Sequence, residues 1–348
     1  MNESNNKKNC VTKCSFGYSV PKDSSCMSST ANSNDTSEHT FCPKLWDEFF
    51  IVEDGVVFPC CERPQEVGNL YHNTLEEICN SKAYQRMREA SLKGELGCYK
   101  NCRLLTKDKI KPDFTKKPKA DYSRMRKLRM LFSEKCNLNC VMCHQNSNAK
   151  QVLSMDVMKK NIDLTPFESI DSQGGESLFI KEANQFFDHA TSQGKKVNLI
   201  TNCTLVNDIW AEKIARHSEF VHISLNASNK KSHEAINRGS NWERVLGNIQ
   251  KIRKYKKELN SNLNIIGHMT ILLRNIDELP DFIRNYKKFG FDTVNFGYTR
   301  SVQFYMKLNP IKRALLRKRV ASAMEEIGYS KDVDTLRLEL LGLVDSEK

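Results

Sequence analysis

The chain has 348 residues, enough for one large domain or two smaller ones, and its 39% hydrophobic and 28% charged residues indicate an ordinary globular protein. No apolar run approaches the roughly 20 residues that a membrane helix needs. The start of the chain, MNESNNKKNC, lacks the apolar core of a signal peptide. We therefore expect a cytoplasmic protein with no membrane partner.

Thirteen cysteines are many for a cytoplasmic chain, because disulfides are rare in that compartment. Their odd number and their close pairs and triplets favour metal sites over a disulfide framework. Several are nevertheless expected to be ordinary buried thiols, with Cys79 and Cys203 first among them.

Residues 1–41 are rich in Ser, Asn, Thr and Lys and contain few large apolar side chains. Such a segment cannot bury enough apolar surface to offset the entropy of ordering, so we expect it to be mostly disordered. Cys10, Cys14 and Cys26 lie within it and could form a metal site, although no flanking core supports one.

Residues 42–102 are predicted to form a compact unit that carries cysteines. The segment LWDEFFIVEDGVVFPCC predicts two short strands joined by a hairpin turn at Asp54-Gly55. A helix is expected to begin at Thr74 with a capping box and to end near Gly94. The unit closes with the sequence CYKNC.

Two stretches concentrate the positive charge of the chain. Residues 103–129 hold eleven Lys or Arg against three Asp, a net of +8, and residues 300–319 hold seven Lys or Arg and no acidic residue, a net of +7. We interpret 103–126 as a basic linker containing proline and the second stretch as a solvated helix face. Both could instead bind nucleic acid or an anionic substrate.

From residue 127 onward, predicted strands alternate with predicted helices, which is typical of parallel β-structure in a doubly wound sheet or a barrel. The pattern alone does not choose between these two. The tail, residues 301–348, is expected to be a helical extension. The predicted strands are 128–133, 169–175, 196–202, 220–226, 263–272 and 292–298, and the predicted helices are 154–162, 180–194, 208–217, 242–258 and 277–290.

The sequence FSEKCNLNCVMCHQ places three cysteines, Cys136, Cys140 and Cys143, in a loop directly after a predicted strand. A loop allows three thiolates to converge on one small cluster, which a continuous strand does not. Because four-iron clusters usually take four thiolates, three would leave one iron open for a small chelating ligand.

This motif and its position resemble the radical SAM superfamily over residues 127–300. The resemblance implies a partial TIM-like (β/α)6 barrel, preceded here by a small cysteine-rich α+β module. It also implies that the open iron of a 4Fe–4S cluster binds S-adenosylmethionine. Reductive cleavage of that molecule would then release a 5′-deoxyadenosyl radical, with electrons from an external one-electron donor such as flavodoxin or ferredoxin.

Three further segments extend the resemblance, and all lie at the ends of predicted strands, where barrel active sites lie. QGGES resembles the family's Gly-Gly-Glu motif, in which glycine backbone approaches the methionine moiety and the glutamate pairs with its ammonium group. ITN resembles the end of the third strand, which lines the site, and SLNAS resembles the segment that contacts the ribose. The implied cofactor-binding residues are Gly174, Gly175, Glu176, Thr201, Asn202, Ser224 and Asn226.

Residues 42–102 resemble the SPASM/twitch modules that bind an auxiliary 4Fe–4S cluster, although such a module usually follows the barrel. The implied ligands are Cys42, Cys60, Cys98 and Cys102. Cys61 competes with Cys60 for this role, because neighbouring residues on a strand point to opposite faces. Zinc sites remain alternatives for both cysteine groups, with His144 as a fourth ligand in the barrel loop.

The sequence therefore predicts a two-cluster radical SAM enzyme that abstracts hydrogen from an unidentified substrate. We favour net oxidation or modification of a sugar-like small molecule, with peptide or protein modification as the alternative. A metal-stabilised nucleic-acid-binding protein is a second alternative. It is disfavoured because the basic stretches contain few aromatic residues for base stacking.

Overall fold

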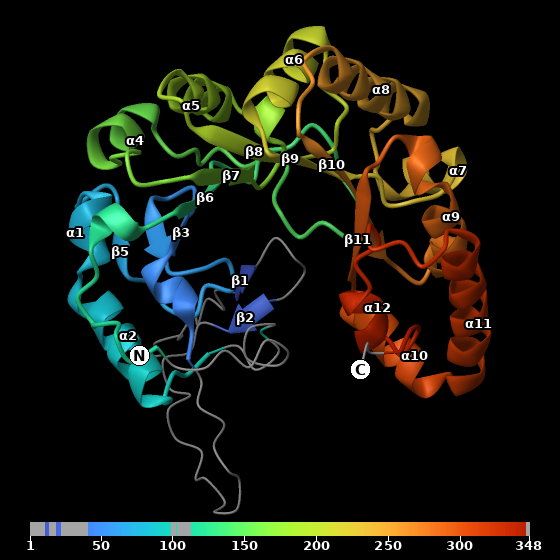
Figure 1. The fold of residues 1–348 in the computed structure, drawn as a ribbon, viewed down its shortest axis with the longest axis horizontal. Helices are drawn as coiled ribbons and strands as arrows, with labels where there is room; N and C mark the ends of the chain where they lie inside the picture. The colour runs from blue at the N-terminus through green and yellow to red at the C-terminus, as the bar shows by residue number, and fades with distance from the viewer. Residues whose placement is uncertain (1–10, 14–18, 22–40, 99–101, 103–112, 346–348) are drawn as a thin grey trace, which may run out of the picture.

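The computed structural model describes residues 11–13, 19–21, 41–98, 102 and 113–345, and one curved sheet of nine strands organises it (Figure 1). Cys10, Cys14, Cys26 and most of the 1–41 segment lie outside the described residues. Within that segment, β1 (Val11–Lys13) and β2 (Ser19–Pro21) pair as antiparallel strands.

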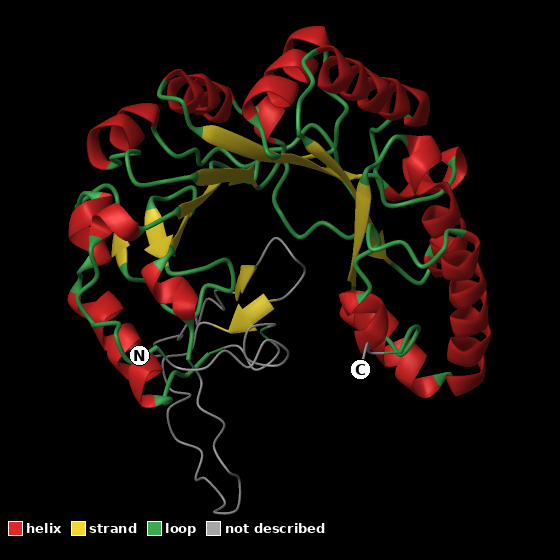
Figure 2. Ribbon diagram, in the orientation of Figure 1, coloured by secondary structure: helices red, strands yellow, loops and turns green. Residues whose placement is uncertain are grey.

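Six parallel strands, in chain order, form the main part of the large sheet. Each strand pairs with the next, and Figure 2 shows the helices on the outer face of an open arc. The predicted partial barrel is therefore confirmed. The strands are β6 (Lys127–Leu131), β7 (Ser169–Gln173), β8 (Lys196–Thr201), β9 (Phe220–Ser224), β10 (Asn264–Ile271) and β11 (Thr293–Tyr298).

The connecting helices match the predicted ones, except for a short helix that the sequence pattern did not indicate. That helix, α7 (Lys230–Ile236), buries only His233 and Ile236, so it carries no clear apolar period. Asn229 caps its first turn by accepting a hydrogen bond from the Ser232 backbone N–H. The others are α4 (Met155–Asn161), α5 (Lys181–Ser192), α6 (Asp208–His217), α8 (Trp242–Glu258) and α9 (Leu279–Phe289).

The sheet has an apolar outer face and a more polar inner face. Along β10 and β11 buried and half-buried residues alternate, as expected when one face packs against helices. Ile265, Met269 and Ile271 belong to the hydrophobic core. His268 and Thr270, on the opposite face of β10, line the inside of the arc.

The N-terminal unit continues the same sheet. Strand β3 (Glu48–Ile51) pairs in parallel with β6, and β4 (Val56–Phe58) and β5 (Gly68–Asn69) follow as antiparallel strands. The predicted hairpin is present, with Gly55 at φ +80°. The described part of the predicted linker packs on this unit, because the Trp46 indole N–H donates to the Lys117 carbonyl oxygen.

One helix expected between Thr74 and Gly94 is divided into α1 (Leu75–Cys79) and α2 (Lys82–Lys93). The predicted capping box at Thr74 is present, and Gly94 ends α2 in the left-handed conformation. The break occurs because Ser81 adopts extended backbone angles and caps α2, accepting a hydrogen bond from the Tyr84 N–H.

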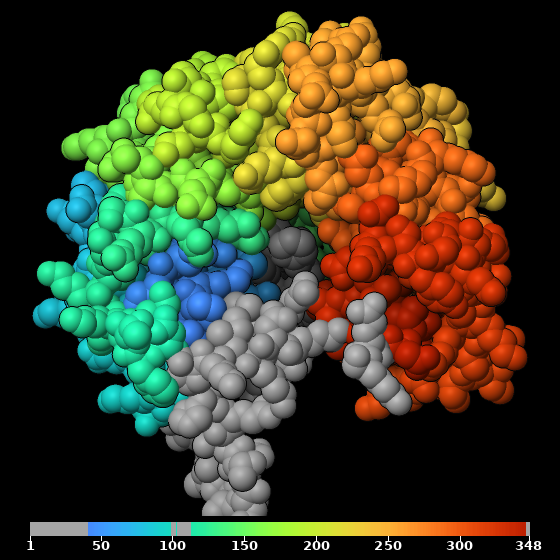
Figure 3. Space-filling model, viewed as in Figure 1, coloured from blue at the N-terminus to red at the C-terminus, as the bar shows by residue number. Residues whose placement is uncertain are grey.

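The C-terminal extension is helical, as predicted, with α10 (Arg300–Leu308), α11 (Pro310–Glu326) and α12 (Leu336–Leu340). Figure 3 shows these helices and the N-terminal unit on opposite sides of the arc. Short 3-10 turns complete the structure: η1 (Pro43–Trp46), η2 (Tyr122–Arg124), η3 (Ser177–Phe179) and η4 (Ile276–Glu278). Across the described residues, no helix is both long and apolar enough to span a bilayer.

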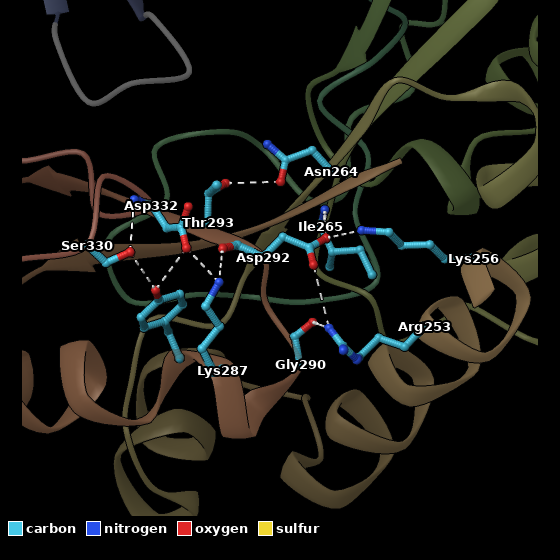
Figure 4. Close-up of polar contacts among 11 residues, drawn as sticks. Arg253, Lys256, Asn264, Ile265, Lys287, Gly290, Asp292, Thr293, Ser330 and Asp332 are labelled. Atoms are coloured by element: carbon cyan, nitrogen blue, oxygen red, sulfur yellow. Dashed lines mark hydrogen bonds and ion pairs between the residues drawn. The ribbon is translucent and has the colours of Figure 1, made fainter. Parts of the chain in front are cut away.

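A polar cluster fixes the amino-terminal ends of β10 and β11 (Figure 4). The Asp292 carboxylate accepts hydrogen bonds from the Ile265 backbone N–H, at 2.8 Å, and from the Lys256 ammonium, at 2.7 Å. Lys287 reaches Asp332 at 2.7 Å. These contacts lie at the opposite end of the strands from the site described below, so their role is structural.

Candidate active site

The three cysteines of the CxxxCxxC motif lie in the loop that follows β6, and all three line one cavity at the carboxyl ends of the strands. Backbone hydrogen bonds hold the loop. The Asn139 N–H donates to the Arg238 carbonyl oxygen, and the Val141 N–H donates to that of Ile236 at the end of α7. Helix α7, which the sequence analysis missed, thus supports the cysteine loop.

The two glycines after β7 allow the chain to pass close to this loop. Gly174 and Gly175 have φ angles of +86° and +54°. A Cβ atom at position 175 would lie 2.0 Å from the Lys135 carbonyl oxygen. The Gly175 N–H donates to the Gln145 side-chain oxygen, and the Glu176 N–H donates to the Lys135 carbonyl. Glycine is therefore required at position 175 for contact with the cysteine loop.

Glu176 is fully buried and lies behind the cavity, outside the set of residues that line it. Its carboxylate accepts hydrogen bonds of 2.7 Å from the Thr201 hydroxyl and 2.7 Å from the Asn202 backbone N–H. Burial raises the pKa of this carboxyl, and the hydrogen bonds from Asn202 and Thr201 oppose that effect. These hydrogen bonds connect Glu176 to Thr201 and Asn202, and both of those residues line the cavity.

Asn202 links this strand end to the first cysteine. Its side-chain amide donates to the Asn137 side-chain oxygen at 2.9 Å and lies 3.8 Å from the Cys136 sulfur, which also accepts from the Leu138 N–H. Burial raises the pKa of Cys136 to about 11 and that of Cys140 to about 12. Metal-free thiols here are therefore protonated at neutral pH, and iron binding would displace their protons.

Ser224 and Asn226 also line the cavity, at the end of β9. Asn226 adopts a positive φ of +60°, and its side chain accepts from the Thr270 N–H and donates to the Asn237 side-chain oxygen. The oxygen and the nitrogen of this side-chain amide are therefore both hydrogen-bonded within the protein. Cys203, buried as expected, has a φ of +61°, a conformation that favours glycine.

Inner-facing polar residues that the sequence analysis missed lie on the strands behind the cysteine loop: His222 and His268 line the cavity, and Asn295 connects them. The Asn295 side-chain oxygen, on β11, lies 2.9 Å from His222 Nε2 and 2.6 Å from His268 Nδ1. Burial lowers the pKa of both imidazoles, that of His268 to about 3, so both are neutral at pH 7. Gln173, at the end of β7, lines the same space. The sequence offered one signal for these residues: each occupies an alternate position of a predicted strand, and alternate positions face the inside of a barrel.

An ion-pair network lies on the inner face where β3 meets β6. Arg129 Nε is 3.1 Å from a Glu48 carboxylate oxygen and 3.6 Å from one of Asp171, while Lys44 is 3.0 Å from Glu48. Several cations of the two basic stretches are likewise paired within the protein. Lys312 and Arg319, for example, both contact Asp277.

The cysteines of the N-terminal unit provide the soft donors that iron–sulfur clusters require. Cys42 and Cys60 are buried, whereas Cys61, Cys98 and Cys102 are half-buried. Burial raises the pKa of Cys42, Cys60 and Cys61. Cys79 is a packing residue, as expected, and is fully buried against Arg88, whose guanidinium donates to its carbonyl oxygen.

Within the described ranges, no three His, Cys, Asp or Glu side chains meet closely enough to hold a single metal ion. A four-iron cluster is larger than one ion, so its thiolates stand farther apart. Three thiols facing one cavity, with the glycine turn beside them, fit such a cluster.

A parallel β/α arc with a cysteine loop and a cavity at the carboxyl ends of its strands defines a barrel enzyme with a metal-dependent site. Comparison with family models identifies it further. The radical SAM superfamily model matches residues 130–286, and an iron–sulfur cluster-binding domain of the SPASM type matches residues 42–103. The chain belongs to the radical SAM superfamily and has its SPASM module in front of the barrel. The family implies a 4Fe–4S cluster with S-adenosylmethionine, and the module implies an auxiliary iron–sulfur cluster.

Curated relatives are distant. The chain is 25% identical over 226 residues to a GTP 3′,8-cyclase of Clostridium botulinum, a match that covers 61% of this chain and 66% of that enzyme. It is 24% identical to the antilisterial bacteriocin subtilosin biosynthesis protein AlbA of Bacillus subtilis, over 48% of this chain and 38% of that protein. The chain thus spans less than two thirds of the length of these relatives.

Among solved structures, Streptococcus suis SuiB bound to precursor peptide SuiA matches with 15% identity and a TM-score of 0.44. That match covers 82% of this chain and 70% of SuiB.

Proposed function

We propose that this chain is a two-cluster radical SAM enzyme that abstracts hydrogen from a neutral, hydroxyl-bearing small molecule. The observation that carries the proposal is a single cavity that joins the three-cysteine loop to the barrel interior. Among the described residues, its lining contains no Lys, Arg, Asp or Glu. A lining of hydroxyls, amides and neutral imidazoles suits an uncharged polar substrate.

In this proposal Cys136, Cys140 and Cys143 hold the cluster that binds S-adenosylmethionine. When bound, that cluster supplies the electron that cleaves S-adenosylmethionine to the 5′-deoxyadenosyl radical. Gly174 and Gly175 bring backbone groups to the methionine end, and Ser224 and Asn226 lie where the ribose would bind. Glu176 acts through Thr201 and Asn202, which it orients toward the cavity.

Cys42, Cys60, Cys98 and Cys102 are the proposed ligands of the auxiliary cluster. A cluster with four thiolates has no open iron for substrate, so we assign it the role of an electron acceptor, which gives net oxidation. Because β3 is hydrogen-bonded to β6, the module that would hold it is part of the same sheet as the cysteine loop. An external flavodoxin or ferredoxin would reduce the other cluster.

Two other substrate classes are suggested by the names of relatives. A GTP cyclase acts on a nucleotide, but a triphosphate would need cations, which the cavity lining lacks. The name of the bacteriocin biosynthesis protein suggests a peptide substrate, and a peptide is our alternative substrate class for this chain. The charge of the cavity is compatible with an uncharged peptide segment.

The test is anaerobic reconstitution with iron and sulfide, followed by S-adenosylmethionine and dithionite. We expect 5′-deoxyadenosine from the wild type and none from the variant with Ala at positions 136, 140 and 143. Deuterated sugars, cyclitols and peptides then separate the substrate classes by deuterium transfer into 5′-deoxyadenosine. Undiminished 5′-deoxyadenosine from the triple variant would overturn the proposal.

A further inference from the structure

Two buried polar side chains in the cavity have unused hydrogen-bonding atoms. Gln173 is 1% exposed and His222 is 8% exposed, and both line the cavity. Within the described part of the chain, the side-chain oxygen and nitrogen of Gln173 and the Nδ1 atom of His222 have no hydrogen-bond partner. Buried polar atoms are rarely left without a hydrogen-bond partner, because their desolvation is then uncompensated, which indicates that a ligand satisfies them.

The hydrogen-bond network fixes what His222 can offer. The Asn295 side-chain oxygen can only accept, so His222 Nε2 and His268 Nδ1 each carry the hydrogen that they donate to it. His222 Nδ1 is then a lone-pair acceptor. His268 is itself fixed, because its Nε2 lies 3.2 Å from the Thr270 hydroxyl. Gly297 leaves room for this arrangement, since a Cβ there would lie 3.3 Å from the His268 ring.

We propose that Gln173 and His222 form a subsite that binds a hydroxyl group of the substrate. The hydroxyl donates its hydrogen to His222 Nδ1 and accepts a hydrogen bond from the Gln173 carboxamide. This inference deepens the proposed function, on which it rests, and assigns the recognition of the substrate to residues of the barrel interior.

The chemistry of the two groups selects against charged ligands. A phosphate dianion or a carboxylate has no hydrogen to give to His222 Nδ1. An ammonium group could donate to both residues, but it would be buried in a cavity whose lining, among described residues, has no carboxylate. A neutral hydroxyl satisfies one donor and one acceptor without burying a charge.

Position in the barrel also distinguishes this subsite from the cofactor contacts. His222 precedes Ser224 by two residues on the same face of β9, so it lies farther from the strand end than the predicted ribose contact. His268 and Asn295 are register partners on β10 and β11 and lie at the same depth in the sheet. His222 therefore lies deeper than the predicted ribose contact, whereas Gln173, at the end of β7, directly precedes the Gly174–Gly175 turn.

The experiment is saturation-transfer NMR on reconstituted enzyme with S-adenosylmethionine and no reductant. The neutral probes are myo-inositol, scyllo-inositol, D-glucose, D-galactose and N-acetylglucosamine, and the charged probes are glucose 6-phosphate and glucosamine. We expect at least one neutral probe to bind, and to bind more tightly than both charged probes. Gln173→Met and His222→Phe should each weaken that binding about tenfold or more.

Matched controls are Gln303→Met and His72→Phe, because both side chains are exposed, and neither should change binding. S-adenosylmethionine affinity and 5′-deoxyadenosine formation without substrate are measured in every variant, and both should be retained in the two exposed control variants. If those two measurements fail in the wild type, the proposed function is wrong; if they succeed, the subsite is tested separately.

Thermal stability gives a readout that does not depend on the probes. Gln173→Met replaces an unpaired carboxamide by an apolar side chain of similar length, so the midpoint of unfolding without ligand should be unchanged or higher. A clear fall would mean that Gln173 has a structural partner. The inference is overturned by that fall, by binding of no neutral probe, by tighter binding of a charged probe, or by unaltered binding in both variants.

Discussion

The Glu176 carboxylate accepts a 2.7 Å hydrogen bond from the backbone N–H of Asn202, whose side-chain amide lies 3.8 Å from the Cys136 sulfur. A buried acid thus fixes the end of β8, and the end of β8 contacts the first cysteine of the loop. The Gly-Gly-Glu turn and the cysteine loop are therefore connected by the hydrogen bonds of Asn202. Both also contribute residues to the wall of the cavity.

We predict that Glu176→Gln weakens S-adenosylmethionine binding about tenfold or more. The change removes a charge-assisted hydrogen bond, worth roughly 1.5–3 kcal/mol, from the segment that lines the cavity. Equilibrium dialysis of the reconstituted, unreduced enzyme measures the dissociation constant. Exposed Glu168 provides the control, since Glu168→Gln changes the same charge away from the site. An unchanged constant in Glu176→Gln would reject the positioning role.

We predict that Gly175→Ala abolishes binding of the cluster at the CxxxCxxC loop. Its Cβ would lie 2.0 Å from the Lys135 carbonyl oxygen, so the loop must move. Gly194→Ala is the matched control, because Gly194 also has a positive φ, of +76°, but its Cβ would meet nothing within 4 Å. The control should only lose about 1–2 kcal/mol of stability. Iron content decides between the two outcomes, and full iron in Gly175→Ala would contradict the prediction.

The sequence pattern predicted six alternating strands and helices, because each element carries its own period and stop signal, whereas the partial barrel was implied by the family resemblance. It also predicted that one site contains Gly174, Thr201, Asn202 and Ser224, because the carboxyl ends of parallel strands lie at the same edge of a sheet. All four residues line the cavity. It did not show that the Glu176 carboxylate accepts hydrogen bonds from Thr201 and Asn202, because the direction of a side chain in a turn depends on tertiary contacts.

The deeper residues escaped prediction for a different reason. His222, His268 and Asn295 are far apart in the sequence and belong to no local motif, so only the register of β9, β10 and β11 brings them together. Likewise, the pairing of β3 with β6 depends on a contact between segments about 80 residues apart, which no local pattern specifies.

We predict that the variant with Ala at positions 136, 140 and 143 retains about four irons per chain in the auxiliary cluster. The proposed auxiliary ligands lie on the N-terminal unit, whose contacts with β6 do not involve the cysteine loop. Iron analysis with Mössbauer and EPR spectra measures the remaining cluster. Zinc instead of iron, or no metal at all, would show that the N-terminal unit has only a structural role.

We predict that Asp292→Ala lowers the free energy of unfolding by about 1–3 kcal/mol without changing the affinity for S-adenosylmethionine. Its carboxylate holds the Ile265 N–H and Lys256 at the amino-terminal ends of the strands, away from the cavity (Figure 4). Denaturant unfolding and equilibrium dialysis test the two parts. Exposed Asp208, whose side chain lies on α6, offers a control substitution by Ala. Weaker S-adenosylmethionine binding in Asp292→Ala would contradict the prediction that the amino-terminal ends of the strands act independently of the cavity at their carboxyl ends.

We predict that His268 makes the protein less stable as the pH falls below about 6.5, the ordinary pKa of histidine. Burial lowers the pKa of His268 to about 3 in the folded chain. Between these two pKa values the unfolded chain binds a proton that the folded chain does not bind. The free energy of unfolding therefore falls by about 1.4 kcal/mol per pH unit for this one group, and levels off below about pH 3.

His268→Gln removes this term, so its stability should depend less steeply on pH between about 6.5 and 5. Lys257→Gln on α8 is an exposed control and should keep the slope of the wild type. Urea unfolding of matched metal-free preparations, followed by circular dichroism, gives the slope at each pH. The absolute stability of His268→Gln can differ because its contact with Asn295 changes, so the slopes are compared. Equal slopes in wild type and His268→Gln would show that His268 titrates normally in the folded protein.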